Sequence, residues 1–480
     1  MSRTRIVPRR EFMKTGGRAL LGASLAWNGF GRTASAEPAA YDVVIVGAGI
    51  AGLTAGYFLG DKRVLILEKE PRPGGRARAG RNAGLPFGLG VSYLGKPYGA
   101  LKNIIDTFNL NLRDIPAPLH AYFAGGEISY GEEGLARLLS ETAGADEFER
   151  FRRAVLEAAR DYYDIPELRM TTRLTALDNI SVARWLETNK LPAPIRPALN
   201  VFTRGLYGAA LDEISALSFI PEMAFALSAD SAGAYTFDGG LVELTDALAR
   251  HLGDRVRTGA RVERVVRRED VYSVSYVGVD GGVSTVEANF VVLAVPAPAA
   301  LALAPEALTA EQKDLLGRIP YAASAFTALF SKEAIFDRAY DLALPDGGLA
   351  TGVNDATRAV RRYEPSAAAK KPFVLGATIA GAGAKDTAFL RLSDEDIRKK
   401  VLEEVGRVIP GAAAKITGCE VTRFPLAYPV MAPGAYKRLL RLNELNSDRL
   451  LLAGDFMIYP SFEAAADSGD FAAEKIKELA

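Results

Sequence analysis

The sequence predicts an α/β protein with two lobes. One is a Rossmann-type lobe built from separated segments, and the other is a mixed α+β lobe that is largely helical. Three features of the 480 residues support this. A strand, a glycine-rich turn, a helix and a second strand follow one another between residues 41 and 68. Helical periodicity dominates residues 99–235. Strand patterns return at residues 255–296 and near the C-terminus, so distant segments have to meet in one sheet.

The first of these units has the pattern of a dinucleotide-binding βαβ unit. Val43–Val46 is a short β-branched run, typical of a buried parallel strand, and a helical run follows the glycines. Gly47 allows a tight turn, Gly49 lets the backbone approach a pyrophosphate at the helix N-terminus, and Gly52 lets helix and strand pack closely. Glu68 ends the second strand 21 residues after Gly47, where an acid can accept hydrogen bonds from ribose hydroxyls.

The middle of the chain is predicted to be helical with one hairpin. Apolar residues recur at helical spacing in Phe148–Tyr163 and in Ser181–Leu191. His120–Tyr130 interrupts the helices, because its Gly125-Gly126 pair is typical of a tight hairpin turn.

Strands dominate again after a helix expected over residues 239–252. Three strands are predicted, over residues 255–270, 271–288 and 289–296, with Asp280-Gly281-Gly282 as a hairpin turn. Residues 309–415 have a mixed pattern, and they include a helix over Ile397–Ile409 that is preceded by a capping box from Ser393 to Asp396. The chain ends in a buried strand, a turn and a long helix.

Composition excludes several classes of protein. At 49% hydrophobic and 24% charged residues, the chain is of ordinary globular type. Its 58 basic and 58 acidic residues balance, and no basic stripe suggests nucleic-acid binding. A single cysteine allows no intrachain disulfide, and the two histidines lie far apart, so no metal site is expected. No apolar run reaches the roughly 18 residues of a membrane-spanning helix.

The N-terminal residues 1–36 are predicted to be a signal peptide. They contain seven basic residues and one acid, then a short apolar run and a small-residue cleavage site at Ala34-Ser35-Ala36. Arg9-Arg10 makes this a twin-arginine signal, which exports folded proteins, so the mature chain would begin near Glu37. We therefore expect the twin-arginine export machinery as a partner and the periplasm as the location.

At this point the chain resembles a known superfamily, the FAD-dependent amine oxidases with their phytoene-desaturase and protoporphyrinogen-oxidase relatives. The resemblance depends on several motifs in their usual order: "VVIVGAGIAGLTAG", "LILEKEPRPGGRAR", "LGVSYLG", "GARVERV", "NFVVLAVP" and "LLLAGDFMIYPSFEAAADSGDFAA". The paired glycines and arginine after the second strand are absent from nicotinamide-binding Rossmann enzymes.

The resemblance implies FAD as the cofactor, and the matching positions imply its binding residues. In the family these run from the glycine loop, through a segment beside the flavin ring, to a C-terminal acid and helix start. They are Gly47, Gly49, Ala51, Gly52, Glu68, Lys69, Gly75, Arg76, Gly90, Val91, Ser92, Val262, Gly454, Asp455, Phe462, Glu463 and Ala464. The FAD-binding domain would comprise residues 41–100, 236–300 and 415–480, and the substrate domain residues 101–235 and 301–414.

The chain departs from the amine-oxidase pattern at two places. The family usually has a lysine soon after the "AVP" strand, but "AVPAPAALALAPEAL" has none, and Lys332 lies too far downstream. The family also often has two aromatic residues facing each other over the flavin. Tyr428 and Phe462 are the catalytic candidates here, although one position aligns with Gly434 or Ala435, near Tyr436. Phe424 is a further aromatic that could face the flavin or simply pack in the core.

Cys419 bears on how FAD would be attached. Some family members hold FAD covalently through a cysteine in this region, but Cys419 lies upstream in an apparent strand. We expect it to be a buried structural thiol and FAD to be bound non-covalently.

The resemblance leaves three functions open. The first is an exported oxidoreductase that transfers a hydride from a small organic substrate to flavin N5, with an amine slightly favoured. The second is a carotenoid- or isoprenoid-type desaturase, or a redox-neutral flavin isomerase, which "AGDF" and "AYPVMAPG" favour. The third is a flavin-binding or electron-transfer subunit without turnover. The electron acceptor could be oxygen, a quinone or a cytochrome.

Overall fold

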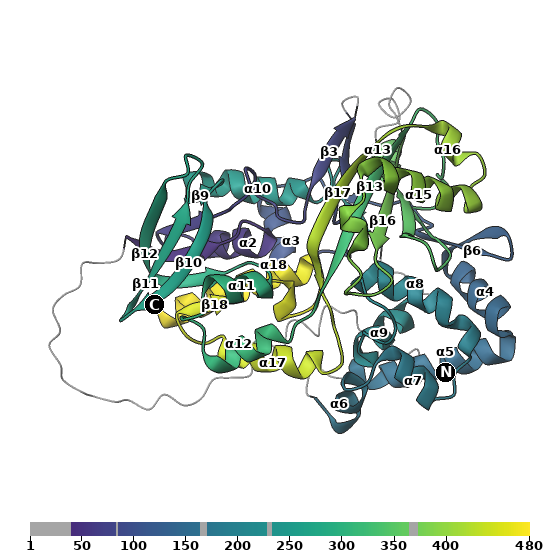
Figure 1. Ribbon diagram of the computed structural model, residues 1–480, viewed down its shortest axis with the longest axis horizontal. Coiled ribbons are helices and arrows are strands. Elements are labelled where there is room, and N and C mark those ends of the chain that lie inside the picture. The colour runs from purple at the N-terminus through teal and green to yellow at the C-terminus, as the bar shows by residue number, and fades with distance from the viewer. Residues whose placement is uncertain (1–39, 83–84, 164–169, 228–232, 364–372) are drawn as a thin grey trace.

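The computed structural model describes residues 40–82, 85–163, 170–227, 233–363 and 373–480. Over these residues it confirms the predicted α/β class, with two seven-stranded sheets that lie side by side and helices around both (Figure 1). The predicted signal peptide, residues 1–36, lies outside the described residues. Among the described helices, none combines the length and the apolar character needed to cross a membrane.

The first sheet contains the predicted βαβ unit and has the strand order β10-β11-β12-β1-β2-β9, with β18 beside β12. Strands β9, β2, β1, β12 and β18 are parallel, whereas β11 is antiparallel to both of its neighbours. The strands are β1 (Tyr41–Val46), β2 (Val64–Leu67), β9 (Val256–Arg257), β10 (Arg261–Arg268), β11 (Val271–Val277), β12 (Val283–Leu293) and β18 (Leu450–Leu452).

Helices cover both faces of this sheet, as expected of a parallel sheet with buried strands. Val43 and Ile45 of β1 pack in the hydrophobic cluster that includes α2, α10, α3 and α18. Val44 and Val46 point to the opposite face, toward α11 and α12. The helices are α2 (Ile50–Phe58), α3 (Gly99–Thr107), α10 (Val242–Leu252), α11 (Ala297–Leu303), α12 (Ala310–Gly317) and α18 (Phe462–Leu479).

One strand differs from the prediction. Residues 271–288 and 289–296 were expected to form separate units, but β12 runs without a break from Val283 to Leu293. Its first half pairs with β11, and its last three residues pair with β18 along the same edge. One long strand can therefore join the antiparallel hairpin to the parallel part of the sheet. The hairpin turn at Asp280-Gly281-Gly282 is confirmed.

The second sheet has the strand order β17-β13-β16-β15-β14-β6-β7. One face packs against α15 and α16, and the other packs against the small β3–β4 sheet. These elements are β3 (Ala79–Asn82), β4 (Leu85–Gly88), β6 (His120–Ala124), β7 (Glu127–Tyr130), β13 (Tyr321–Ser331), β14 (Asp341–Ala343), β15 (Ala350–Asp355), β16 (Phe373–Ala380), β17 (Ile416–Pro429), α15 (Asp394–Val408) and α16 (Ala412–Lys415).

The sheets do not follow the predicted domain boundary at residue 415. Strand β17 belongs to the predicted FAD-binding segment 415–480, yet it pairs with β13 over most of its length in the second sheet. The reason is that β13 is buried along nearly its whole length and needs a partner on both edges. Within that segment, β18 and α18 do lie with the first sheet. The other domain boundaries stay a prediction.

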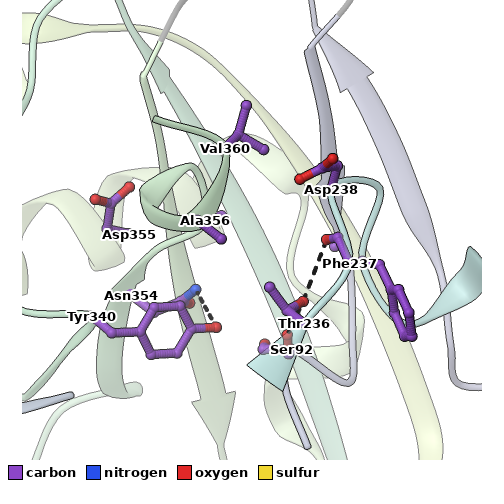
Figure 2. A pocket seen from close by; sticks show the side chains of 12 residues that line it. Ser92, Thr236, Phe237, Asp238, Tyr340, Asn354, Asp355, Ala356 and Val360 are labelled. Atoms are coloured by element: carbon purple, nitrogen blue, oxygen red, sulfur yellow. Dashed lines mark hydrogen bonds between the residues drawn. The ribbon is translucent and has the colours of Figure 1, made fainter. Parts of the chain in front are cut away.

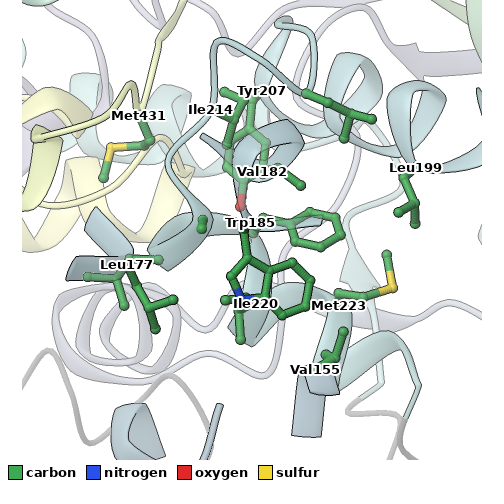
Figure 3. Packing of buried hydrophobic residues seen from close by; sticks show 14 of the residues in the cluster. Val155, Leu177, Val182, Trp185, Leu199, Tyr207, Ile214, Ile220, Met223 and Met431 are labelled. Atoms are coloured by element: carbon green, nitrogen blue, oxygen red, sulfur yellow. The ribbon is translucent and has the colours of Figure 1, made fainter. Parts of the chain in front are cut away.

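Most of the helical region predicted between residues 99 and 235 forms a separate core beneath the second sheet (Figure 1), whereas its first helix, α3, packs with the first sheet. Figure 3 shows Trp185 among Val155, Ile220 and Met223, with Met431 entering from the segment after β17. The helices of this core are α4 (Gly131–Ala143), α5 (Ala145–Tyr163), α6 (Thr172–Asp178), α7 (Val182–Thr188), α8 (Arg196–Tyr207) and α9 (Ala216–Ala226), and α17 (Ala435–Leu445) joins them from the C-terminal part of the chain. The short strands β5 (Arg113–Asp114) and β8 (Tyr235–Thr236) pair with each other, and the short helix α13 (Arg358–Tyr363) follows β15 in the chain.

Local signals in the sequence were largely reliable. The hairpin at His120–Tyr130 is confirmed, and both Gly125 and Gly126 have positive φ, at 58° and 84°. Ser393 caps α15 by accepting from the Asp396 N–H, as predicted. The Asp396 carboxylate accepts from the Ser393 hydroxyl at 2.7 Å. A complete capping box, not predicted, occurs at Thr309 before α12.

Candidate functional site

The glycine loop after β1 brings the backbone to the N-terminus of α2. Gly47 has a φ of 102°, which favours glycine, and a Cβ there would lie 2.6 Å from the Ala294 carbonyl oxygen. At Gly52 a Cβ would overlap the Gly47 carbonyl oxygen, so helix and loop touch at this position. At Gly49, which caps α2, a Cβ would meet no atom within 4 Å. The loop therefore leaves open space at a helix N-terminus, where an anion is favoured.

Glu68 lies at the end of β2, next to this loop. One carboxylate oxygen accepts from the Ala48 N–H at 2.8 Å, and the other accepts from the Glu70 N–H at 2.9 Å. The side chain is buried, and each oxygen keeps a lone pair for a further donor. This fits an acid that accepts from ribose hydroxyls. Lys69 points the other way, with 66% of its side chain exposed and an ion pair to Glu70 at 3.7 Å.

Val262 and Ala51 support the loop from two sides. The Ala260 N–H donates to the Glu68 carbonyl oxygen at 2.8 Å, which holds the start of β10 beside the end of β2. Val262, two residues on, is buried in the core of this sheet. Ala51 lies in α2, and its carbonyl touches Gly469 of α18, where a Cβ would collide with it. The two helices pack closely there because neither contact residue has a large side chain.

Arg76 joins three segments that are far apart in the sequence. Its guanidinium donates to the Asp455 carboxylate at 2.7 Å and to the Ala427 carbonyl oxygen at 2.5 Å. The paired glycines before it pack on the first loop: the Gly74 N–H donates to the Ala48 carbonyl oxygen at 2.8 Å. Burial lowers the pKa of Arg76, but the Asp455 carboxylate outweighs it, so the pKa is raised above its ordinary value.

The C-terminal motif supplies the other half of this contact. Asp455 is buried, and its second oxygen accepts from the Phe456 N–H at 3.1 Å. The Gly454 N–H donates to the hydroxyl of Ser468 in α18 at 2.8 Å, which fixes the turn before the helix. Asp455, Gly454 and Arg76 were all predicted, and the structure brings them together.

The start of α18 is capped within the chain. Ser461 accepts from the Ala464 N–H at 3.1 Å, so this N–H of the predicted flavin-facing helix start already has a partner. Glu463 accepts from the Gly95 N–H at 3.0 Å, which ties the helix to the "LGVSYLG" segment. Phe462 is buried in the core of the first sheet, among residues of α18 and α2. Its contacts are those of a core residue, and its catalytic role stays a prediction.

The segment Gly90–Ser92 passes beside Arg76. A Cβ at Gly90 would collide with the Arg76 carbonyl oxygen, and the ring of Phe424 lies 3.2 Å from the same position. Val91 packs against the core that contains α2 and α18. The Ser92 hydroxyl donates to the Gly90 carbonyl oxygen at 3.1 Å. This segment therefore lies between the Arg76 contact and the second sheet.

Tyr428 lies near the end of β17, one residue after the carbonyl that Arg76 contacts. Burial raises the pKa of Tyr428, although its bond with Ser324 and the charge of Arg76 act in the opposite direction. The phenol is therefore protonated at neutral pH. Its ring touches Gly208, which follows α8 in the helical region. Tyr436, by contrast, lies on α17 and is buried in the helical core. Gly434 caps the same helix.

Two residues of this site were not predicted. The Tyr321 hydroxyl accepts from the Ala297 N–H at 3.1 Å, and burial together with the Asp455 charge raises its pKa. Ser324 donates to the Ile379 carbonyl oxygen at 2.9 Å and also bonds to Tyr428. Both are on β13, in a region whose sequence carries no recognised motif. Only the pairing of β13 with β17 brings them to Arg76.

Cys419 is far from the site formed by Arg76, Asp455 and Tyr428. It pairs with Leu329 near the other end of β17, nine residues before Tyr428, or roughly 30 Å along an extended strand. Its thiol is half-buried rather than fully buried as expected, and this burial raises its pKa. Lys332 follows the end of β13 and is exposed, eight residues beyond Ser324. Among the described residues, no three His, Cys, Asp or Glu side chains are grouped to hold a metal ion.

The fold and this site define a dinucleotide-binding flavoprotein with two lobes. The open space at Gly49, the ribose-type acid Glu68 and the Arg76–Asp455 contact lie along one path from the first sheet to the second. They fit FAD. The chain belongs to the flavin-containing amine oxidoreductase family, whose model it matches over residues 50–477. The description of this family implies an FAD-dependent oxidoreductase.

Known proteins of this type resemble the chain in sequence and in fold. A Mycobacterium tuberculosis protein named as a flavin-containing monoamine oxidase, AofH, is 30% identical over 286 residues, which are 55% of this chain and 59% of that protein. A Dictyostelium discoideum protein named as a flavin-containing monoamine oxidase A is 25% identical over 76% of this chain and 79% of its own length. The structure of cyclohexylamine oxidase from Brevibacterium oxydans superposes with a TM-score of 0.72 at 20% identity, covering 92% of this chain and 100% of that one, which shows the shared fold.

Proposed function

We propose that the protein oxidises a small organic amine and that it does so after export from the cytoplasm. The observation that carries the proposal is the place where Arg76, Asp455 and Tyr428 meet, because it unites three motif segments at one site. The names of the similar proteins, which are amine oxidases, support an amine over other substrates.

FAD, when bound, would accept a hydride at N5 from the substrate carbon next to nitrogen, which leaves an imine. The chain itself would hold and shield the substrate. Tyr428, half-buried and protonated, offers a neutral aromatic surface rather than a charge, which suits an amine that has lost its proton. Arg76 keeps its positive charge near the cofactor because Asp455 is beside it, and a fixed cation favours the negative charge of reduced FAD.

The family lysine has no counterpart in the described site. The stretch after β12 lacks a lysine, and Lys332 lies beyond the far end of β13. The polar side chain beside Tyr428 on β13 is the hydroxyl of Ser324. If the reaction needs a positioned water, hydroxyl groups rather than an ammonium would hold it. Cys419 is remote from Arg76 and Asp455, which supports non-covalent FAD.

The test is an anaerobic screen of the purified, FAD-loaded protein with primary, secondary and cyclic amines. Bleaching of the flavin absorbance by an amine supports the proposal. Bleaching by a polyene or terpenoid but by no amine would favour the desaturase function instead. A flavin that only dithionite reduces would favour an electron-transfer or binding subunit. Reoxidation of the reduced protein by oxygen, a quinone or a cytochrome would then identify the acceptor.

Export through the twin-arginine route is a separate part of the proposal. It is supported by Arg9-Arg10 and by the contact between Arg76 and Asp455, which are 379 residues apart, because a cofactor held by both could bind only once the chain has folded. Replacing Arg9 and Arg10 by Lys should leave a yellow, FAD-bound precursor in the cytoplasm. A colourless precursor there, with flavin found only in the periplasmic form, would contradict loading before export.

A further inference from the structure

Two recesses of the molecule differ in how their charged groups are partnered. The first lies between the two sheets and encloses about 400 Å³, including the part that is open to solvent (Figure 2). Both of its carboxylates have cationic partners: Asp238 binds Arg113 at 3.1 Å, and Asp355 binds Arg361. The second recess lies beside α17 and encloses about 270 Å³, again including the part that is open to solvent. The charged residue that lines it is Arg438, and its charge is not balanced in this way.

The second recess has an apolar wall. Eight of its nine lining residues are apolar, and they come from four segments that are separated in the sequence. Val430 and Met431 follow β17, and Leu439 lies on α17. Phe456 comes directly after Asp455 of the candidate site. These four side chains are buried, so the wall favours an apolar group over water.

Arg438 lines the same recess and is half-buried. Within the part of the chain that the structure describes, its guanidinium makes no hydrogen bond and no ion pair. Burial lowers the pKa of Arg438, although the charge of Asp178 acts in the opposite direction. The oxygens of Asp178 already accept from the N–H groups of Tyr436 and Lys437, each at 3.2 Å. A cation that has lost part of its hydration without gaining an acceptor is unfavourable, so an anion beside Arg438 would be stabilising.

Two other arginines of this region are paired with the acids of α12. Arg441, three residues after Arg438 on α17, donates to both oxygens of Glu311, at 2.7 and 2.9 Å. Arg318, which directly follows α12, donates to Asp314 at 2.9 Å. Both acids of α12 are therefore already in use, and among these three arginines Arg438 is the one that remains for an acid from outside the chain.

We propose that the second recess binds a carboxylic acid with an apolar tail, whose carboxylate pairs with Arg438 and whose tail lies against the apolar wall. The planar guanidinium can donate two parallel N–H groups to a carboxylate, which suits this anion. Burial of the tail contributes further affinity. The bound acid stabilises the folded protein, because the unfolded chain has no such recess. The proposal requires neither an amine substrate nor a place for the flavin ring, so it does not rest on the proposed function.

The test is isothermal titration calorimetry of the FAD-loaded protein with octanoate, below the concentration at which octanoate forms micelles. 1-Octanol keeps the tail without the charge, and acetate keeps the carboxylate without the tail. We expect both to bind about tenfold or more weakly than octanoate, and octanoate to raise the melting temperature. Arg438→Gln should weaken octanoate binding by about tenfold and leave 1-octanol binding unchanged. Ala435→Leu, which fills part of the recess, should weaken the binding of both.

Lys437→Gln is the matched control, because it removes a positive charge at the next position of α17 from a side chain that is exposed and does not line the recess. It should bind octanoate as the natural protein does. The proposal is overturned if Arg438→Gln binds octanoate as tightly as the natural protein, if Lys437→Gln loses binding equally, or if the natural protein does not bind octanoate. If Ala435→Leu fails to fold, Arg438→Gln decides. No amine and no turnover are involved, so octanoate can bind while every amine fails to reduce the flavin, and the reverse.

Discussion

The two sides of the candidate site are stabilised by different parts of the chain. On the side of the first sheet, backbone contacts set the shape of the site: Gly52 touches the Gly47 carbonyl oxygen, and the space at Gly49 is open. On the side of the second sheet, side-chain contacts set the shape of the site, since Tyr428 and Ser324 meet across paired strands. The first side therefore depends on spacing within a short stretch, and the second depends on register between strands from distant segments. Substitutions should affect the two sides in different ways.

The largest effect is expected for Gly52→Ala. The added Cβ would collide with the Gly47 carbonyl oxygen, and backbone atoms on both sides cannot move away without displacing α2 from β1. We expect a loss of about 3 kcal/mol or more in the free energy of unfolding, or no soluble protein. Chemical denaturation followed by circular dichroism measures this.

Gly49→Ala is the matched variant at the same loop. Its Cβ meets no protein atom within 4 Å, and its φ of −75° suits any residue. The apoprotein should therefore keep the stability of the natural protein, while FAD binds more weakly because the methyl group occupies the approach to the helix N-terminus. Equal destabilisation by the two variants would show that the loop is not divided into a packing position and a binding position.

The next effect is a pH dependence located at α18, on the side of the first sheet. Burial, together with the charges of Asp470 and Glu463, raises the pKa of Asp467 to about 7, although the Ala100 N–H acts in the opposite direction. The folded protein therefore holds a proton that the unfolded chain, with its ordinary pKa of 3.8, has already lost. The contribution of Asp467 to stability is greatest at low pH and falls as the pH rises from about 4 to about 7, by up to about 4 kcal/mol.

Asp467→Asn should remove that slope, because the amide keeps an oxygen to accept from Ala100 but does not ionise. The measurement is the difference in unfolding free energy between variant and natural protein at pH 5 and pH 8. Asp470→Asn serves for comparison, since burial and the Glu474 charge raise the pKa of Asp470 only to about 6. If Asp467→Asn and the natural protein have the same difference in unfolding free energy between pH 5 and pH 8, Asp467 is not the titrating group.

Between the two sides lies the Arg76–Asp455 contact. Asp455→Ala would remove one charge-assisted hydrogen bond of Arg76 and leave its bond to the Ala427 carbonyl oxygen. With 34% of the Arg76 side chain exposed, water compensates in part, so we expect a loss of about 2 kcal/mol. FAD should also be lost more readily on gel filtration. Arg76→Lys keeps the charge, so its stability and FAD retention should lie between those of Asp455→Ala and those of the natural protein. Full FAD retention in Asp455→Ala would contradict a role of this contact in holding the cofactor.

The division into two sides also explains what the sequence could predict. Gly47, Gly52 and Glu68 lie within one βαβ unit, so spacing alone located them. Arg76 and Asp455 were found only because family motifs mark both, since nothing local says that residues 379 positions apart will touch. Tyr321 and Ser324 carry no motif, and their place depends on a bulge in the β13–β17 register. The same pairing took β17 away from the lobe to which the boundary at residue 415 assigned it.

The smallest effect is expected for Tyr428→Phe, on the side of the second sheet. The change removes one hydroxyl that bonds to Ser324 and keeps the ring against Gly208, so the cost should be about 1 kcal/mol in stability. If the ring surface is what an amine meets, the rate of flavin reduction should change by less than about tenfold, whereas Tyr428→Ala should lose far more. Stopped-flow reduction with an amine found in the screen measures both variants. Because the phenol of Tyr428 is protonated well above neutral pH, Tyr428→Phe should also leave the pH profile of reduction unchanged. A profile that shifts with this variant would mean that the hydroxyl takes part in proton transfer, and the second side would then act through chemistry as well as shape.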